Sequence, residues 1–250
     1  MIDNIFTKLF QFFIFWYICG FILVGFDILP SWLEWSNSVF IITSGLLAVL
    51  YFMKMYDPLV GIVLSAGIFV TTFIVEYFGS STSFLFGDYY YTDQFAPNVM
   101  NVPIAIGFAW VMVIATGLAL IRLLAITNAI VRALLGGLAA LAMDLVLDPV
   151  AYLVKGYWIW EEAGLYYDIP WTNFFGWFII AFCIHFLLSF VRQQQRFSSF
   201  DQKMLVIYIG IIVMFAWIAL LATLWLATII GLLSAAFVFV LMYLKRGANA

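Results

Sequence analysis

The sequence is poor in charged side chains. Only 9% of its 250 residues are charged and 67% are hydrophobic, whereas soluble domains carry about 25% charged residues. A soluble body of this size could not be covered with so few polar side chains. This scarcity excludes a soluble globular protein and predicts a protein of the lipid bilayer.

Other features are also scarce. No long basic run points to nucleic acid. A single histidine and scattered acids lack the spacing of a metal site, so we expect no metal and no cofactor. Cys19 and Cys183 fall inside apolar runs, where cysteine behaves as a small hydrophobe rather than a disulfide partner. The first apolar run has no small-residue cleavage pattern after it, so we interpret it as a retained anchor.

Long hydrophobic runs are what the sequence does have. A spanning helix needs about 20 apolar residues. The last two spans come from one unbroken apolar stretch, which we divide near Thr223. We therefore predict an all-α, polytopic membrane protein with residues 1–250 in one transmembrane domain. The predicted helices are roughly 5–26, 37–55, 59–79, 102–121, 128–147, 171–190, 204–222 and 225–244.

The basic residues predict the orientation, because cytoplasmic connections carry an excess of lysine and arginine. With both termini inside, only Lys155 of the ten basic residues lies outside. A seven-span arrangement would move Lys245 and Arg246 outside. We therefore expect a multi-pass protein of the cell membrane with both termini in the cytoplasm. The inner residues are Lys8, Lys54, Arg122, Arg132, Arg192, Arg196, Lys203, Lys245 and Arg246.

Two long outer loops, 80–101 and 148–170, are rich in aromatic and acidic residues. They contain FGDYYYTD (86–93) and KGYWIWEEAGLYYD (155–168). Aromatic residues at this depth can form an interfacial belt, or they can wall a pocket that stabilises a cation, and we expect several to do both. The candidates are Tyr89, Tyr90, Tyr91, Tyr157, Trp158, Trp160, Tyr166, Tyr167 and Trp171, with Trp110 and Trp177 on the helices that follow the loops.

The two loops lead into similar helices, VPIAIGFAWV (102–111) and IPWTNFFGWF (169–178). Pro103 matches Pro170 and Trp110 matches Trp177 at the same offset, and Glu76 falls one position short of matching Asp144. This pattern predicts a parallel internal repeat with units of about 59–122 and 127–191, whose interface is a natural place for a site. Similar hydrophobic helices could also produce part of the match by chance.

The stretch MDLVLDP (143–149) places two acids near the outer end of a span, and Glu76 lies near the outer end of another. Asp144 and Asp148 share one helix face. Two carboxyls that close do not both ionise readily in an apolar site, which leaves an acid beside a base. The alternative is structural: Asp148 caps a turn at the helix-stopping Pro149, and Asp144 bonds a neighbouring helix. Both interpretations stay open on the residues alone.

His185, the only histidine, lies about 22 Å below the outer end of its helix, 15 residues after Pro170. That depth separates it from a site built by the outer loops. We expect a hydrogen-bonded residue of helix packing.

The stretch MDLVLDPVAYLVKGYWIWEEAGLYYDIPWTNFFGW, together with FGDYYYTDQFAPNVMNVPIAIGFAW, resembles the integral-membrane carotenoid hydratases of the CruF type. The resemblance covers about residues 60–190. It implies addition of water to the C1,C2 double bond at an acyclic ψ-end of a carotenoid. The architecture is also distantly similar to membrane lycopene cyclases of the heterodimeric type, which carry paired acids after a proline. Here Asn173 stands in that place, which argues against cyclisation.

The resemblance, combined with the acids, implies acid–base hydration without a cofactor. Asp144 protonates C2, and Asp148 or Glu76 holds a water that Asn173 orients. The expected partners are an acyclic carotenoid, membrane lipids and other enzymes of carotenoid synthesis. The alternatives are a carotenoid end-group cyclase or isomerase, and a non-enzymatic polyene or lipid carrier.

Overall fold

The computed structural model describes residues 2–194 and 197–247, with side chains described to residue 245. Within these ranges, eight helices are long and apolar enough to cross a membrane. This confirms the predicted all-α membrane fold. The helices are α1 (Ile2–Leu23), α2 (Trp35–Met55), α3 (Pro58–Thr82), α4 (Ile104–Leu123), α5 (Ala129–Leu153), α6 (Trp171–Leu188), α7 (Ser199–Leu221) and α8 (Trp225–Gly247).

The break between the last two helices lies where it was predicted. Helix α7 ends at Leu221 and α8 begins at Trp225. Between them, Thr223 has a φ of 60°, which a continuing right-handed helix does not allow. The long apolar stretch is therefore two antiparallel spans.

The prediction that Pro149 stops its helix was wrong. Helix α5 runs on to Leu153 with Pro149 inside it. Proline has no N–H, so it cannot bond the carbonyl of Leu145 four residues earlier. The hydroxyl of Tyr166 donates to that carbonyl at 2.7 Å, which satisfies the acceptor that proline leaves free. Asp148 consequently lies within the helix and caps no turn.

The two long loops are joined by short strands. Strand β1 (Tyr89–Tyr91) pairs antiparallel with β4 (Trp158–Trp160). Strands β2 (Asn98–Val99) and β3 (Val102–Pro103) form a second pair within the first loop. Two 3₁₀ turns complete this end of the molecule: η1 (Ser31–Leu33) and η2 (Asp93–Phe95).

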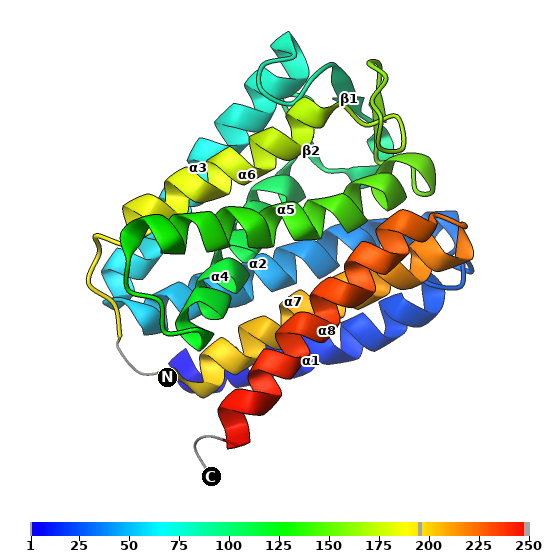
Figure 1. The fold of residues 1–250 in the computed structure, drawn as a ribbon. Helices are drawn as coiled ribbons and strands as arrows, with labels where there is room; N and C mark the ends of the chain where they lie inside the picture. Colours follow the sequence, from blue (N-terminus) through cyan, green and yellow to red (C-terminus); the bar gives the residue numbers. More distant parts are fainter. Residues whose placement is uncertain (1, 195–196, 248–250) are drawn as a thin grey trace.

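Helix α4 occupies the centre of the bundle and contacts α2, α3, α5 and α7. Figure 1 shows both chain ends at one end of the bundle and the strands at the other. The two chain ends share one end of the bundle because the number of spans is even. Which end faces the cytoplasm stays a prediction, and Arg196, one of the residues that supports it, lies outside the described residues.

Candidate functional site

Glu76, on α3, is a buried carboxyl group surrounded by donors. Its Oε2 atom accepts hydrogen bonds from the hydroxyls of Tyr89 at 2.7 Å and Tyr91 at 2.8 Å. Its Oε1 atom accepts one from the indole Nε1 of Trp110 at 2.8 Å. The side chain is 4% exposed. Three hydrogen-bond donors, two from β1 and one from α4, therefore converge on this one buried carboxyl group.

The strand geometry of β1 explains why two of the three consecutive tyrosines reach Glu76. Alternate residues of a strand share one face, so Tyr89 and Tyr91 point the same way while Tyr90 is exposed. Burial, followed by the charge of Glu76, raises the pKa of Tyr89 and of Tyr91 well above the ordinary value. Both hydroxyls therefore keep their protons and act as donors at neutral pH.

Asp148, on α5, is bound in the same way by the other strand. Its Oδ1 atom accepts from the indole Nε1 of Trp158 at 2.7 Å and of Trp160 at 3.2 Å. These two tryptophans alternate with Ile159 on β4 and so share a face. The Oδ2 atom of Asp148 accepts from the side-chain nitrogen of Asn173 at 2.7 Å.

Asp144 differs from Asp148 in its donors. Asn173, in the first turn of α6, gives its second side-chain hydrogen to Oδ2 of Asp144 at 2.9 Å. This is the one hydrogen bond that the Asp144 side chain makes to the described residues. The two aspartates are thus held by a single amide, and Asp144 also bonds a neighbouring helix, as the structural alternative expected.

The pairing of β1 with β4 links the two carboxyl centres. Tyr89 lies opposite Trp160, and Tyr91 lies opposite Trp158. One small sheet therefore presents four aromatic donors, two for Glu76 and two for Asp148. The YYY and WIW clusters of the sequence are therefore explained by the alternation of side chains along paired strands, and not by an interfacial belt alone.

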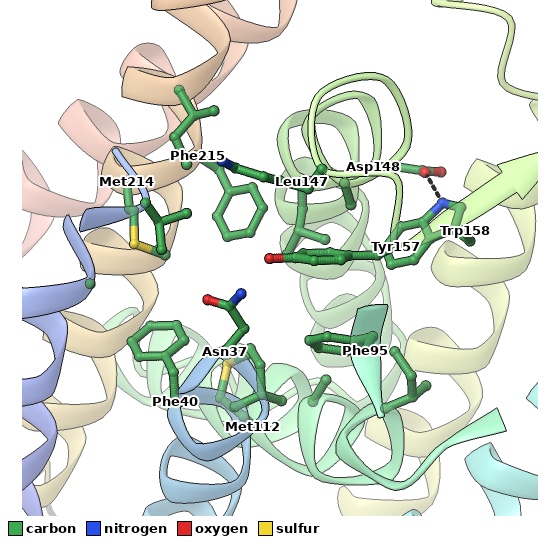
Figure 2. Close-up of a pocket in the computed structure, with 18 of the residues that line it drawn as sticks. Asn37, Phe40, Phe95, Met112, Leu147, Asp148, Tyr157, Trp158, Met214 and Phe215 are labelled. Carbon is green, nitrogen blue, oxygen red and sulfur yellow. Dashed lines mark hydrogen bonds between the residues drawn. The ribbon is translucent and has the colours of Figure 1, made fainter. Parts of the chain in front are cut away.

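A cavity of about 330 Å³ opens beside these groups and is lined by Glu76, Asp144, Asp148 and Asn173. Figure 2 shows part of its wall, including the hydrogen bond from Trp158 to Asp148. Apart from the acids, its walls are mostly apolar. The predicted aromatic residues that line it are Tyr89, Tyr91, Trp110, Tyr157, Trp158, Trp160 and Trp177.

Three predicted substrate-binding residues are not part of the cavity wall. Tyr166 bonds the carbonyl that Pro149 leaves free. The hydroxyl oxygen of Tyr167 accepts the backbone N–H of Leu226 at 3.0 Å, which caps the start of α8. Trp171 is 73% exposed at the helix end. These aromatics support helix ends or face outward.

The opposite wall of the cavity was not anticipated. It is formed by α1, the start of α2 and the middle of α7, which the sequence distinguished by hydropathy alone. Asn37, a polar residue in the first turn of α2, was the signal that could have shown it. The residues of this wall include Phe15, Trp16, Cys19, Gly20, Asn37, Phe40, Met214 and Phe215.

His185 lies away from the cavity, as predicted. It is 1% exposed and packs where Gly117 and Gly136 leave room for its ring. The expectation that it is hydrogen-bonded was wrong, because neither ring nitrogen has a partner among the described residues. Those residues also contain no group of three His, Cys, Asp or Glu side chains that could hold a metal ion.

The fold and the site define a polytopic membrane protein with a carboxyl cluster on an apolar, aromatic-walled cavity. The chain matches the profile of the carotenoid biosynthesis protein family over residues 36–238, and it belongs to that family. The match confirms the resemblance at the level of a membrane family of carotenoid biosynthesis, and it extends the likeness into the outer helices. No curated protein and no solved structure matches the chain.

Proposed function

We propose that the protein is a carotenoid 1,2-hydratase, which adds water across the C1,C2 double bond of an acyclic ψ-end group. The observation that carries this proposal is the unequal bonding of the paired aspartates. Asp148 accepts three hydrogen bonds from protein donors, whereas Asp144 accepts one. Donors stabilise a carboxylate, so Asp144 is the better proton donor and Asp148 the better base.

The first step is proton transfer. The alkene π electrons form a bond between C2 and the acid proton of Asp144, which leaves Asp144 ionised and a tertiary cation at C1. A general acid of this kind contributes about 10²- to 10⁴-fold to a rate. A buried carboxyl with one donor suits the role, because few contacts hold it in the ionised form before the reaction.

The cation at C1 must be stabilised by protein groups that do not attack it as nucleophiles. Aromatic faces attract cations and do not form a bond with them. Trp110 and Trp177 line the cavity as a stacked pair, and Tyr89 and Trp160 line it with ring centroids 4.9 Å apart. The carboxylate of Glu76, on the same cavity, adds negative charge nearby.

The second step is capture by water. The water oxygen forms a bond to C1, and its surplus proton passes to Asp148. Transfer of that proton to Asp144 restores the starting site. The sum of the steps is alkene plus water giving a tertiary alcohol, with no electron transferred. Asn173, bonded to both carboxyl groups, fixes their separation and is proposed as the residue that orients the water.

The proposal is tested with purified protein in detergent and an acyclic carotene, without oxygen or added cofactor. The expected product is the 1-hydroxy carotenoid, with one carbon-bound deuterium at C2 from deuterated water and its oxygen from ¹⁸O-labelled water. A cyclic product with deuterium but no solvent oxygen would indicate a cyclase. Unchanged carotene that nevertheless binds the protein would indicate a carrier. Oxygen derived from O₂ would exclude the carbocation route.

A further inference from the structure

A second set of polar residues lies on the cavity, at the end of the bundle that carries the loops. Asn37, Lys155 and Tyr157 all line it. Figure 2 shows the amide of Asn37 and the hydroxyl of Tyr157 pointing into the same open space, with Phe40, Met112 and Phe215 around it. None of these polar groups bonds the carboxyl cluster of Glu76, Asp144 and Asp148.

Tyr157 has a polar atom that the protein does not satisfy. The residue is 7% exposed, and its ring is stacked on Phe95 with centroids 4.8 Å apart. Within the described part of the chain, no group forms a hydrogen bond with its hydroxyl. The hydroxyl is not among the fully buried polar atoms that lack a partner, and it lies on the cavity wall, so a water in the cavity can supply the missing partner.

Charged residues connect this part of the cavity to the surface. Asn37 donates to Oε2 of Glu34 at 2.7 Å. The Lys155 ammonium is paired with Asp27 at 3.0 Å; the Lys155 side chain is 13% exposed and that of Asp27 is 91% exposed. The ion pair therefore stands at the boundary between the cavity and the outside.

Besides burial, the negative charge of Glu34 influences the pKa of the Tyr157 hydroxyl. Burial, and after it the negative charge of Glu34, raises the pKa of the Tyr157 hydroxyl above its ordinary value. The phenol therefore stays protonated and can donate to a water or accept from one. Glu34, Asn37 and Tyr157 together form a polar path along one side of an otherwise apolar cavity.

We propose that Glu34, Asn37, Lys155 and Tyr157 form a water entrance, through which water reaches the carboxyl cluster from the loop side. The inference deepens the proposed function and rests on it, because hydration consumes one water for each double bond. The chain itself joins the two parts: Tyr157 is followed by Trp158, which donates to Asp148. The polyene would occupy the apolar remainder of the cavity.

The entrance is tested by thiol labelling in a variant that lacks Cys19 and Cys183. Asn37→Cys and the more conservative Ser36→Cys both place a thiol on the cavity wall. Leu46→Cys, on the same helix α2, is the matched control, because Leu46 is 41% exposed on the outer surface of the bundle. Leu165→Cys, in the exposed loop, reports full access to water. The probe is a charged, membrane-impermeant methanethiosulfonate added from the loop side.

Because a thiol ionises poorly in apolar surroundings, we expect Asn37→Cys and Ser36→Cys to react at least about tenfold faster than Leu46→Cys. Equal rates at all three positions would overturn the entrance. If Asn37→Cys did not fold, Ser36→Cys alone would decide. This readout does not depend on the reaction, so a protein that labels as expected but forms no alcohol would refute the proposed function and leave the entrance intact.

A kinetic experiment tests whether the water entrance contributes to catalysis. Asn37→Leu and Tyr157→Phe keep the size of each side chain and remove its polar atoms. Each should lower the kcat of water addition by about threefold to tenfold, the loss of roughly one hydrogen bond to water, with the KM for the carotene little changed. A rise in KM at unchanged kcat would contradict water delivery and assign the residues to polyene binding.

Discussion

The indole rings of Trp110 and Trp177 stack with their centroids 4.3 Å apart and their planes 25° apart. Trp110 also donates to Glu76, and Trp177 lies one helical turn after Asn173 on the same face of α6. The stack therefore joins the Glu76 centre to α6, whose Asn173 donates to both aspartates of α5. These tryptophans are also the pair that the predicted repeat aligns, although an origin by duplication stays a prediction.

Asp144→Asn and Asp148→Asn should each lower the yield of hydroxylated carotenoid by about 10²-fold or more, because an amide can neither deliver the proton nor accept it. The measurement is product analysis after co-expression with a pathway that makes acyclic carotenes, with the amount of inserted protein quantified. Asp93→Asn, an exposed loop aspartate, is the matched control. Normal yields from both cavity variants would show that the aspartates have a structural role only.

Tyr166→Phe should lower the free energy of unfolding by about 1–3 kcal/mol, because the Leu145 carbonyl beside Pro149 loses its donor. In a Pro149→Ala background the loss should be smaller, since an alanine at this position supplies the backbone N–H that the helix lacks. The double-mutant cycle is read from denaturation of the protein in detergent. Equal losses in the two backgrounds would mean that Tyr166 acts through packing instead.

Gly136→Ala should destabilise the protein by about 1–3 kcal/mol through overpacking, because the added Cβ would lie 1.9 Å from Cδ2 of His185. Gly67→Ala is the control, since a Cβ there meets nothing within 4 Å. His185→Ala should rescue Gly136→Ala by removing the ring.

His185→Gln should keep much of the activity, because the histidine lies outside the cavity.

The orientation can be tested with single cysteines in the variant without Cys19 and Cys183. Leu165→Cys, on the exposed second loop, should be labelled by an impermeant reagent added outside intact cells. Lys8→Cys, near the N-terminus, should react only after the membrane is opened. The reverse result would place the loops and the carboxyl cluster on the cytoplasmic side and would contradict the distribution of basic residues.

The sequence by itself determined the eight spans and the break at Thr223, because hydropathy over about 20 residues is a local property that the bilayer thickness converts into helices. It also placed Asp144 and Asp148 on one face, since helical periodicity needs no partner. The candidate carboxyls were recognisable because acids are rare within the spans of a membrane protein, whereas Asn173 was singled out by the family resemblance.

Tertiary structure alone decided which aromatic residues meet the acids. The pairing of β1 with β4 directs two tyrosines to Glu76 and two tryptophans to Asp148, and it joins loops more than 60 residues apart in the chain. It also decided that α5 continues through Pro149, because the missing donor is replaced by Tyr166 from another segment. The wall formed by α1, α2 and α7 stayed hidden for a related reason. Apart from Ser36 and Asn37, the residues that these helices contribute to the wall are almost all apolar, and an apolar residue carries no local mark of the neighbours against which it packs.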